Sequence, residues 1–225
     1  MVAGSWPAGS VTDDTQMATA LARTLMERGG FRASATGQAY ATWMVHSFDI
    51  GNQTAAALRK VAAGTAPSDA GEQVWTSGGR RAAGNGSLMR TIPIALFYEP
   101  DPPRRREVSM EDSAITHFDP RCQLACAAYN GAVAAAVRGP VKSAQQLLDA
   151  ALEDLNLGEA ELAARYPQEA AHIRAAGDQL RADLKAATDA DPDLYGAEVH
   201  LGKMAGYVRV AFRLAFWQLM HATSF

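Results

Sequence analysis

The sequence predicts an all-α fold, an orthogonal bundle of many helices, and three observations support this prediction. Apolar residues recur at intervals of three and four in several segments, which is the spacing of one face of a helix. No segment alternates apolar and polar residues over the length of a strand, and no repeat of fixed period is present. The chain has 225 residues, 48% of them hydrophobic, which is enough for one substantial core, so we expect residues 1–225 to form a single domain.

Three helices are predicted in the first third of the chain. Apolar residues recur at helical spacing from Thr15 to Arg28, and Gly29 with Gly30 ends this helix. Residues 64–86 are rich in Gly and Ser and predict a long loop, and long loops in compact domains are often functional. The remaining predictions for this part are helices over 35–45 and 54–63, and a loop over 1–11.

Prolines interrupt the middle of the chain. The apolar run over 88–97 contains Pro93, which fits a helix kinked or begun near that residue, and a strand is also open. Residues 99–108 are rich in Pro and Arg, and we expect a linker whose arginines, 104–106, lie in a solvated loop. The later predictions are helices over 119–137, 144–155, 159–185 and 200–220, with a turn over 189–196.

The charge of the chain argues against nucleic acid as a partner. The net charge is -3, from 21 Lys and Arg against 24 Asp and Glu, so no strongly basic field is present. Binding to a nucleic-acid backbone depends on such a field. We therefore expect no nucleic-acid partner. The sequence leaves the oligomeric state open, with a monomer as the default expectation.

The cysteines and the apolar segments bear on the compartment. Cys122 and Cys126 are four residues apart, so a helix places both on one face, and without further Cys a zinc site is not expected. Buried thiols in a reducing cytosol are the better interpretation. No secretory signal is visible, and the late apolar segment contains Arg209 and Arg213, which argues against a membrane span. We expect a cytoplasmic protein.

Four segments contain residues that can carry chemistry. The first, from Val11 to Thr15, reads Val-Thr-Asp-Asp-Thr just before a predicted helix. Its Asp and Thr side chains can cap the helix, and acids there suit the helix dipole. The same oxygens also suit a hard cation such as magnesium, manganese or calcium, and the residues alone leave both possibilities open.

The second and third segments combine glycines with polar side chains. Residues 49–54 read Asp-Ile-Gly-Asn-Gln-Thr, which fits a turn and cap, or an acid beside a helix start that faces an anion. Residues 84–90 read Gly-Asn-Gly-Ser-Leu-Met-Arg, which fits a simple turn or a loop that cradles a phosphate. The fourth segment, residues 115–120, reads Ile-Thr-His-Phe-Asp-Pro, and its histidine is either structural or a ligand-binding group.

Taken in this order, the four segments resemble the ADP-ribosylglycohydrolase family. The resemblance rests on Thr-Asp-Asp-Thr, Asp-x-Gly-Asn-x-Thr, Gly-Asn-Gly-Ser-Leu-Met-Arg and Thr-His-x-Asp-Pro, and it covers residues 5–137 with specific motifs. It implies an all-α fold of that type and a binuclear site for magnesium or manganese. It also implies a hydrolase that removes ADP-ribose from a modified protein or a small molecule at an N- or O-glycosidic bond.

The resemblance also implies roles for individual residues. Thr12, Asp13 and Asp14 match the metal ligands of the family. Asp49 and Asp14 are implied to be catalytic, with Asp49 a candidate acid or base. The residues implied to lie along the substrate are Gly51, Asn52, Gly84, Asn85, Gly86, Ser87, Met89 and His117.

Two family motifs are absent from the printed sequence. These are an early Gly-Asp-x-x-Gly and a late Gly-Gly-Asp-x-Asp-Thr, whose aspartates complete the metal site in the family. Half a ligand set should hold magnesium poorly, because water competes for the open positions. We therefore expect a chain incomplete at both ends. The alternative to an active hydrolase is an inactive ADP-ribose-binding module or a truncated fragment of such an enzyme.

Overall fold

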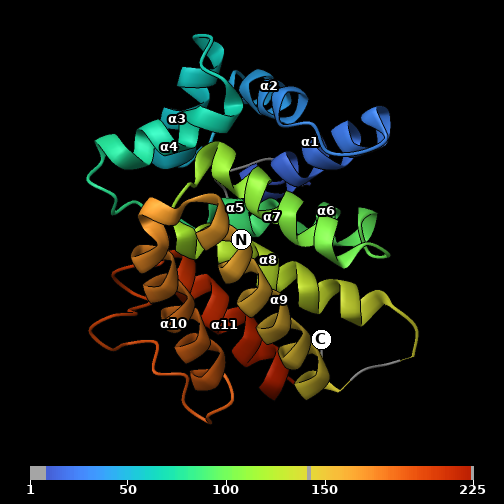
Figure 1. Ribbon diagram of the computed structural model, residues 1–225, viewed down its shortest axis with the longest axis vertical. Coiled ribbons are helices and arrows are strands. Elements are labelled where there is room, and N and C mark those ends of the chain that lie inside the picture. The colour runs from blue at the N-terminus through green and yellow to red at the C-terminus, as the bar shows by residue number, and fades with distance from the viewer. Residues whose placement is uncertain (1–8, 141–142, 224–225) are drawn as a thin grey trace.

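A computed structural model describes residues 9–140 and 143–223, and every regular element in these ranges is helical, which confirms the predicted fold class. Figure 1 shows the helices crossing at steep angles. Their bounds are α1 Asp13–Arg28, α2 Ala33–Met44, α3 Asn52–Ala62, α4 Pro67–Ser77, α5 Gly86–Arg90, α6 Ile92–Phe97, α7 Pro102–Thr116, α8 Pro120–Val137, α9 Ala144–Arg165, α10 Ala170–Ala186 and α11 Val208–His221, with a 3-10 turn Pro167–Glu169.

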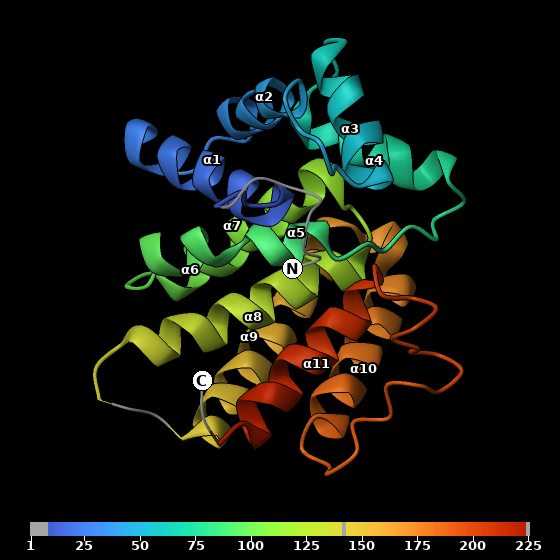
Figure 2. The same ribbon diagram turned by 180° about the vertical axis from the view of Figure 1, so that it is seen from behind.

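The helices form two groups around two cores. Helices α1 to α4 gather at one end of the molecule and α8 to α11 at the other, with α5, α6 and α7 between them (Figures 1 and 2). The first core includes Leu21, Tyr40 and Leu58, and the second includes Leu124 and Leu155, all fully buried. The prediction of a single domain stays a prediction.

Glycine and alanine let the central helices approach closely. Helix α8 packs against both α7 and α9 and is rich in small residues. A Cβ at Gly131 of α8 would lie 2.6 Å from Oδ2 of Asp154 on α9, a distance that no real Cβ tolerates. The small residue therefore sets the separation between these two helices.

The long loop predicted over 64–86 is wrong, because α4 occupies the middle of this segment. Pro67 begins this helix, a position that suits proline because the first helical N–H groups have no partner within the helix. Its buried face consists only of Ala70, Gly71 and Trp75, so the apolar periodicity was too weak to read. Gly71 fits closely against α7, since a Cβ there would lie 2.1 Å from the carbonyl oxygen of Ala114.

The linker predicted over 99–108 is also wrong. Asp101 accepts a hydrogen bond from the N–H of Arg104 at 3.2 Å, and this cap begins α7. Arg105 and Arg106 are only 6% and 5% exposed, so they do not lie in a solvated loop. Both guanidinium groups donate to the carboxylate of Asp154 at 2.9 Å, which satisfies charges that a loop would have left to water.

Several boundaries differ from the prediction. The run over 88–97 forms two short helices, α5 and α6, with Pro93 in the first turn of α6, so the helical alternative holds there. Helix α9 continues to Arg165, and the break expected before residue 159 occurs instead at Pro167. The last helix begins at Val208, because residues 205–207 pair with a distant loop.

Two further expectations concern the cysteines and membrane spans. Cys122 and Cys126 are fully buried free thiols, as predicted. Their burial raises the pKa of both, to about 11 for Cys126. Among the residues described, no helix is both long and apolar enough to cross a bilayer.

Candidate functional site

Three acidic side chains meet at the beginning of α1. Thr12 precedes the helix with extended backbone, and its side chain makes no capping hydrogen bond. Oδ2 of Asp49 instead accepts from the N–H of Asp13 at 3.2 Å, and Oδ1 of Asp13 accepts from the N–H of Asp14 at 3.1 Å. The first and second predicted segments are therefore in contact, across 36 residues of sequence.

The acids in this cluster oppose one another's ionisation. Burial, followed by the charges of Asp14 and Asp49, raises the pKa of Asp13 to about 6. Burial also raises the pKa of Asp14, to which the charge of Asp49 adds. Oδ1 of Asp49 is buried and has no hydrogen-bond partner within the described residues. A bound cation would stabilise this concentrated negative charge.

The donor chemistry of this cluster fits a hard divalent cation. Carboxylate and hydroxyl oxygens are the ligands that magnesium, manganese and calcium prefer. The unpartnered Oδ1 of Asp49 and the open hydroxyl of Thr12 have no competing role among the contacts described. Yet no group of three or more His, Cys, Asp or Glu in the described chain is arranged closely enough to enclose an ion. These residues fit part of a coordination shell, with the remaining positions left to water or substrate.

The glycine loop of the third segment is fixed by the segment that leads into α11. The N–H of Asn85 donates to the carbonyl of Gly206 at 2.9 Å, and the N–H of Val208 donates to the carbonyl of Ala83 at 3.0 Å. The side-chain amide of Asn85 also donates to the carbonyl of Ala205 at 3.3 Å. Asn85 therefore anchors the loop to the last helix.

Gln53 joins the loop to the other two segments, and the sequence analysis missed it. Its Oε1 accepts from the N–H of Gly84 at 3.0 Å, and its Nε2 donates to the carbonyl of Thr116 at 3.4 Å. Two N–H groups of the predicted phosphate cradle, those of Gly84 and Asn85, are thus already bonded inside the protein. The only available signal was the place of Gln53 between Asn52 and Thr54 in the second segment.

His117 packs directly beneath the loop. Its ring lies 3.1 Å from the place of a Cβ at Gly84, and also 3.1 Å from that at Gly86, so both positions require glycine for this close approach. Burial lowers the pKa of His117 to about 3, with a contribution from the charge of Arg90. The imidazole is therefore neutral at ordinary pH and supports the loop from inside, so its contact with a substrate stays a prediction.

The other predicted substrate residues differ in exposure. Ser87 is fully buried, and its Oγ accepts from Ser113 Oγ at 2.9 Å, which turns it away from solvent. Gly51 and Asn52 are exposed at the start of α3, and Met89 is 43% exposed on α5. Their roles toward a ligand stay predictions.

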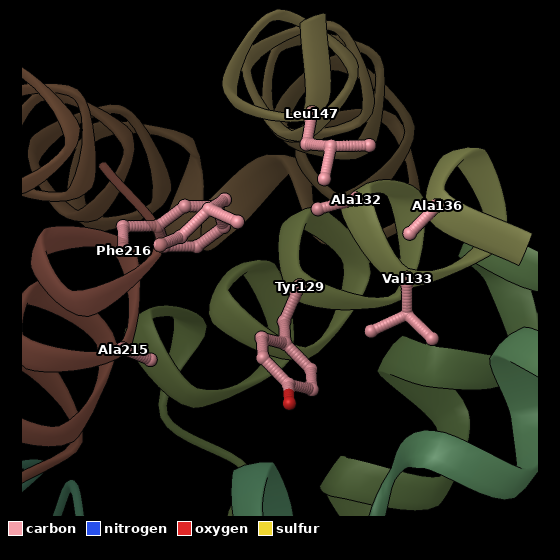
Figure 3. Close-up of a pocket in the computed structure, with 8 residues that line it drawn as sticks. Tyr129, Ala132, Val133, Ala136, Leu147, Ala215 and Phe216 are labelled. Carbon is pink, nitrogen blue, oxygen red and sulfur yellow. The ribbon is translucent and has the colours of Figure 1, made fainter. Parts of the chain in front are cut away.

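Several hollows open on the described surface, and two of them bear on the position of the site: an apolar one and a polar groove beside the glycine loop. Figure 3 shows the residues around the apolar hollow, of about 250 Å³, among them Tyr129 and Val133 of α8, Leu147 of α9 and Phe216 of α11. It lies roughly 16 Å along α8 from Cys122, which contacts the glycine loop, and it lacks charged groups, so it is not the candidate site. The polar groove, of about 540 Å³, adjoins the loop and is lined by Arg81, Ala83, Gly84, Arg121, Gln179, Glu198, Met204, Gly206, Tyr207 and Arg209.

Comparisons with known proteins agree with the four segments. The family model described as ADP-ribosylglycohydrolase matches residues 1–225. The chain is 30% identical over 133 residues to ADP-ribosyl-[dinitrogen reductase] glycohydrolase of Rhodospirillum rubrum, covering 56% of this chain and 42% of that protein. It is 31% identical over 156 residues to ADP-ribosylarginine hydrolase Tri1 of Pseudomonas putida (strain GB-1), covering 59% of this chain and 37% of that protein. The matched part spans about two fifths of the length of these curated relatives.

Proposed function

The chain belongs to the ADP-ribosylglycohydrolase family, and on this basis we propose that it forms the substrate-binding and metal-binding part of a hydrolase that removes ADP-ribose from a modified protein. The observation that carries the proposal is the meeting of Asp13, Asp14 and Asp49 beside the glycine loop. Helix α1 packs against α5, the short helix that follows this loop, so the acids and the loop belong to one region. The two relatives described above are named for ADP-ribose removal, and one is named for arginine, so an N-glycosidic bond to arginine is the first substrate to test.

We infer that Thr12, Asp13 and Asp14 hold a divalent cation, magnesium or manganese. Their oxygens suit either ion, and a cation would offset both the burial and the repulsion from Asp14 and Asp49 that raise the pKa of Asp13. When bound, such an ion lowers the pKa of water and orients the hydroxyl groups of a sugar. The names of the two relatives mention no metal, so they do not distinguish magnesium from manganese.

Asp49 is the residue we assign to proton transfer. Its Oδ2 stays on the N–H of Asp13, which fixes the carboxylate, while Oδ1 is free to accept a proton. In the proposed reaction water adds to the anomeric carbon, the bond from that carbon to the leaving nitrogen breaks, and Oδ1 takes the proton from the water. The same proton then passes to the leaving nitrogen, so that ADP-ribose and the free side chain are the products.

The test is release of ADP-ribose from an ADP-ribosyl-arginine substrate with manganese, with magnesium and with a chelator. We expect release that the chelator abolishes and that Asp14→Asn and Asp49→Asn each reduce at least roughly 100-fold. Asp178→Asn is the matched control, because Asp178 is an exposed acid on α10, and it should leave release unchanged.

Other outcomes separate the alternatives. Binding of ADP-ribose without release, and without need of metal, would indicate a binding module, a possibility favoured by the open coordination shell. A folded protein that neither releases nor binds ADP-ribose would overturn the proposal.

A further inference from the structure

Asp119 and Arg121 form a fully bonded pair at the beginning of α8. Oδ1 of Asp119 accepts from the backbone N–H of Arg121 at 3.0 Å and from its Nε at 2.8 Å. Oδ2 accepts from Nη2 of Arg121 at 2.7 Å and from Nε1 of Trp75 at 2.9 Å. The bonds from Nε and Nη2 hold the guanidinium plane in one orientation, because a bidentate pair fixes geometry as well as charge, and the other two bonds fix the carboxylate.

The stability of α8 alone does not account for Arg121. Asp119 already caps the helix, whereas a cation in the first turn opposes the helix dipole. Burying a charged pair also costs solvation free energy, and the side chain of Arg121 is only 16% exposed. An arginine at this place therefore needs another explanation, and its remaining bonds supply one.

Arg121 reaches from α8 to the segment that holds the glycine loop. Its Nη1 donates to the hydroxyl of Tyr207 at 2.9 Å, and the guanidinium lies 5.5 Å from the centre of that ring. Tyr207 stands between Gly206 and Val208, whose backbone groups pair with Asn85 and Ala83 on either side of Gly84. A shift of Tyr207 would thus move the segment that pairs with the loop.

Arg121, Tyr207 and Gly84 also line the same open groove, of about 540 Å³. A ligand on the loop would meet the ring of Tyr207 and the backbone of Gly84 together, so their relative position sets the shape of the site. We propose that Arg121, held by Asp119, is a positioning residue that fixes Tyr207 and the glycine loop in the arrangement that ADP-ribose binds. This inference rests on the proposed function, since it names ADP-ribose as the ligand of the loop.

Two variants test this proposal, one at each partner of the hydrogen bond between Arg121 and Tyr207. Arg121→Lys keeps the charge and loses the planar fork, and Tyr207→Phe keeps the ring and loses only the hydroxyl. Arg80→Lys is the matched control, because Arg80 also lies over an aromatic ring, 5.4 Å from the centre of that of Trp75, but is 51% exposed and pairs with Glu169 rather than with Tyr207.

The first readout is amide hydrogen exchange of the free protein at Asn85 and Val208. We expect both test variants to speed exchange at these two amides roughly 10-fold, with Arg80→Lys within about two-fold of the wild type. The second readout is affinity for ADP-ribose, which should weaken roughly 10-fold in each test variant while kcat at saturation changes less than about two-fold. The double variant should be no weaker than Arg121→Lys alone, because both changes break the same bond.

The outcomes distinguish this inference from the proposed function. Unchanged exchange at both amides, or effects on affinity that simply add, would overturn the positioning role. Faster exchange in a protein whose wild type does not bind ADP-ribose would overturn the proposed function and, with it, the ligand named here. If Arg121→Lys fails to fold, Tyr207→Phe still decides the question, because it removes a single hydroxyl from a half-buried ring.

Discussion

The ring of His117 packs against Gly84 and Gly86, the glycines on either side of Asn85. It occupies the space that a side chain at either position would need. The ring is 2% exposed, and its Nδ1 lies 2.8 Å from Oγ1 of Thr116. An imidazole in this position cannot gain a proton without leaving a charge buried next to Arg90. The site loop therefore depends on a histidine that stays neutral.

The buried state of His117 predicts a pH dependence of stability. Its pKa is about 3 in the folded protein against 6.5 in the unfolded chain, so below pH 6.5 the unfolded chain binds a proton that the folded protein does not. The free energy of unfolding should fall with decreasing pH between 6.5 and 3, by up to about 1.4 kcal/mol per pH unit from this residue. Urea unfolding at pH 7 and pH 5 measures it.

A matched pair of variants isolates this effect. His117→Gln should show a smaller loss between pH 7 and pH 5 than the wild type, whereas His221→Gln, at an exposed position, should keep the wild-type slope. Equal slopes in all three proteins would contradict the assignment of the pH dependence to His117.

Gly84→Ala tests the close approach at the loop. The added Cβ would lie 3.0 Å from Oε1 of Gln53 and 3.1 Å from Nε2 of His117, and neither group is free to move. We expect the free energy of unfolding to drop by about 1–3 kcal/mol, the usual effect of overpacking. Gly51→Ala is the control, because its φ of -67° is ordinary and nothing lies within 4 Å of the new Cβ. Equal stability of the two variants would show that the loop has room.

For single residues, the sequence shows which residue types the candidate site contains, but it does not show which of them are in contact. The family resemblance implied separate roles for Asp13 and Asp49, and the structure brings the two residues into contact. Gln53 and Arg121 could not have been found, because their partners Gly84 and Tyr207 lie 31 and 86 residues away along the chain. The burial of Ser87 was equally hidden, since a serine after glycine reads as polar and exposed.

Helix α7 shows how charged residues can form the interior side of a helix. Arg105 and Arg106 both pair with Asp154, a residue of α9 that is 4% exposed. Arg106 also donates to Glu161 and therefore has a second acid, whereas Arg105 pairs with Asp154. This charge cluster joins α9 to α7, the helix that ends directly before His117.

Asp154→Ala should strongly destabilise the protein. It leaves the guanidinium of Arg105 buried without its acid, and loss of one partner of a buried pair costs about 3–5 kcal/mol. Urea unfolding provides the measurement, with Asp178→Ala as the control. Asp178 pairs with Arg181 while its side chain is 76% exposed, so its removal should change stability by less than about 1 kcal/mol. A similar small effect of both variants would show that water reaches Arg105.

The elements that the sequence analysis missed share a physical reason. Helix α4 buries Gly71 and helix α7 buries Arg105, and neither residue type signals a buried helical face. Helices α1, α2, α3 and α8 were found within a few residues, because each buries apolar residues at helical spacing, and glycine or proline marks an end of α1, α3 and α8. Pattern analysis thus detects burial of apolar groups and overlooks burial by close backbone approach or by ion pairing.

In the molecule as a whole, the candidate site lies between the two cores. Ala83 and Leu88, on either side of the loop, belong to the core of α8 to α11, whereas Leu58 of the helix after Asp49 belongs to the other. A ligand bound by both the acids and the loop would therefore connect the two groups of helices. Binding of this kind stabilises the folded state of the whole chain.

Thermal unfolding measures this coupling. ADP-ribose with manganese, each at 100 times its dissociation constant, should add at least about 2.7 kcal/mol to the free energy of unfolding and raise Tm by roughly 5–10 °C. Asp14→Asn should lose the part of the shift that depends on manganese and keep the part due to ADP-ribose. An unchanged Tm of the wild type in the presence of both would argue against a ligand between the two cores.

The bond between Asn85 and Ala205 spans 120 residues, and this has a consequence for synthesis of the protein. While a ribosome makes the chain, the acids and glycines of the site emerge first, and the segment that anchors the loop emerges 120 residues after Asn85. Until residues 205–208 have left the ribosome and α11 has packed against α8, the loop has no partner for Asn85. The nascent chain therefore carries the residues of the site long before it has the site, and premature release would yield a protein with the motifs and an unanchored loop.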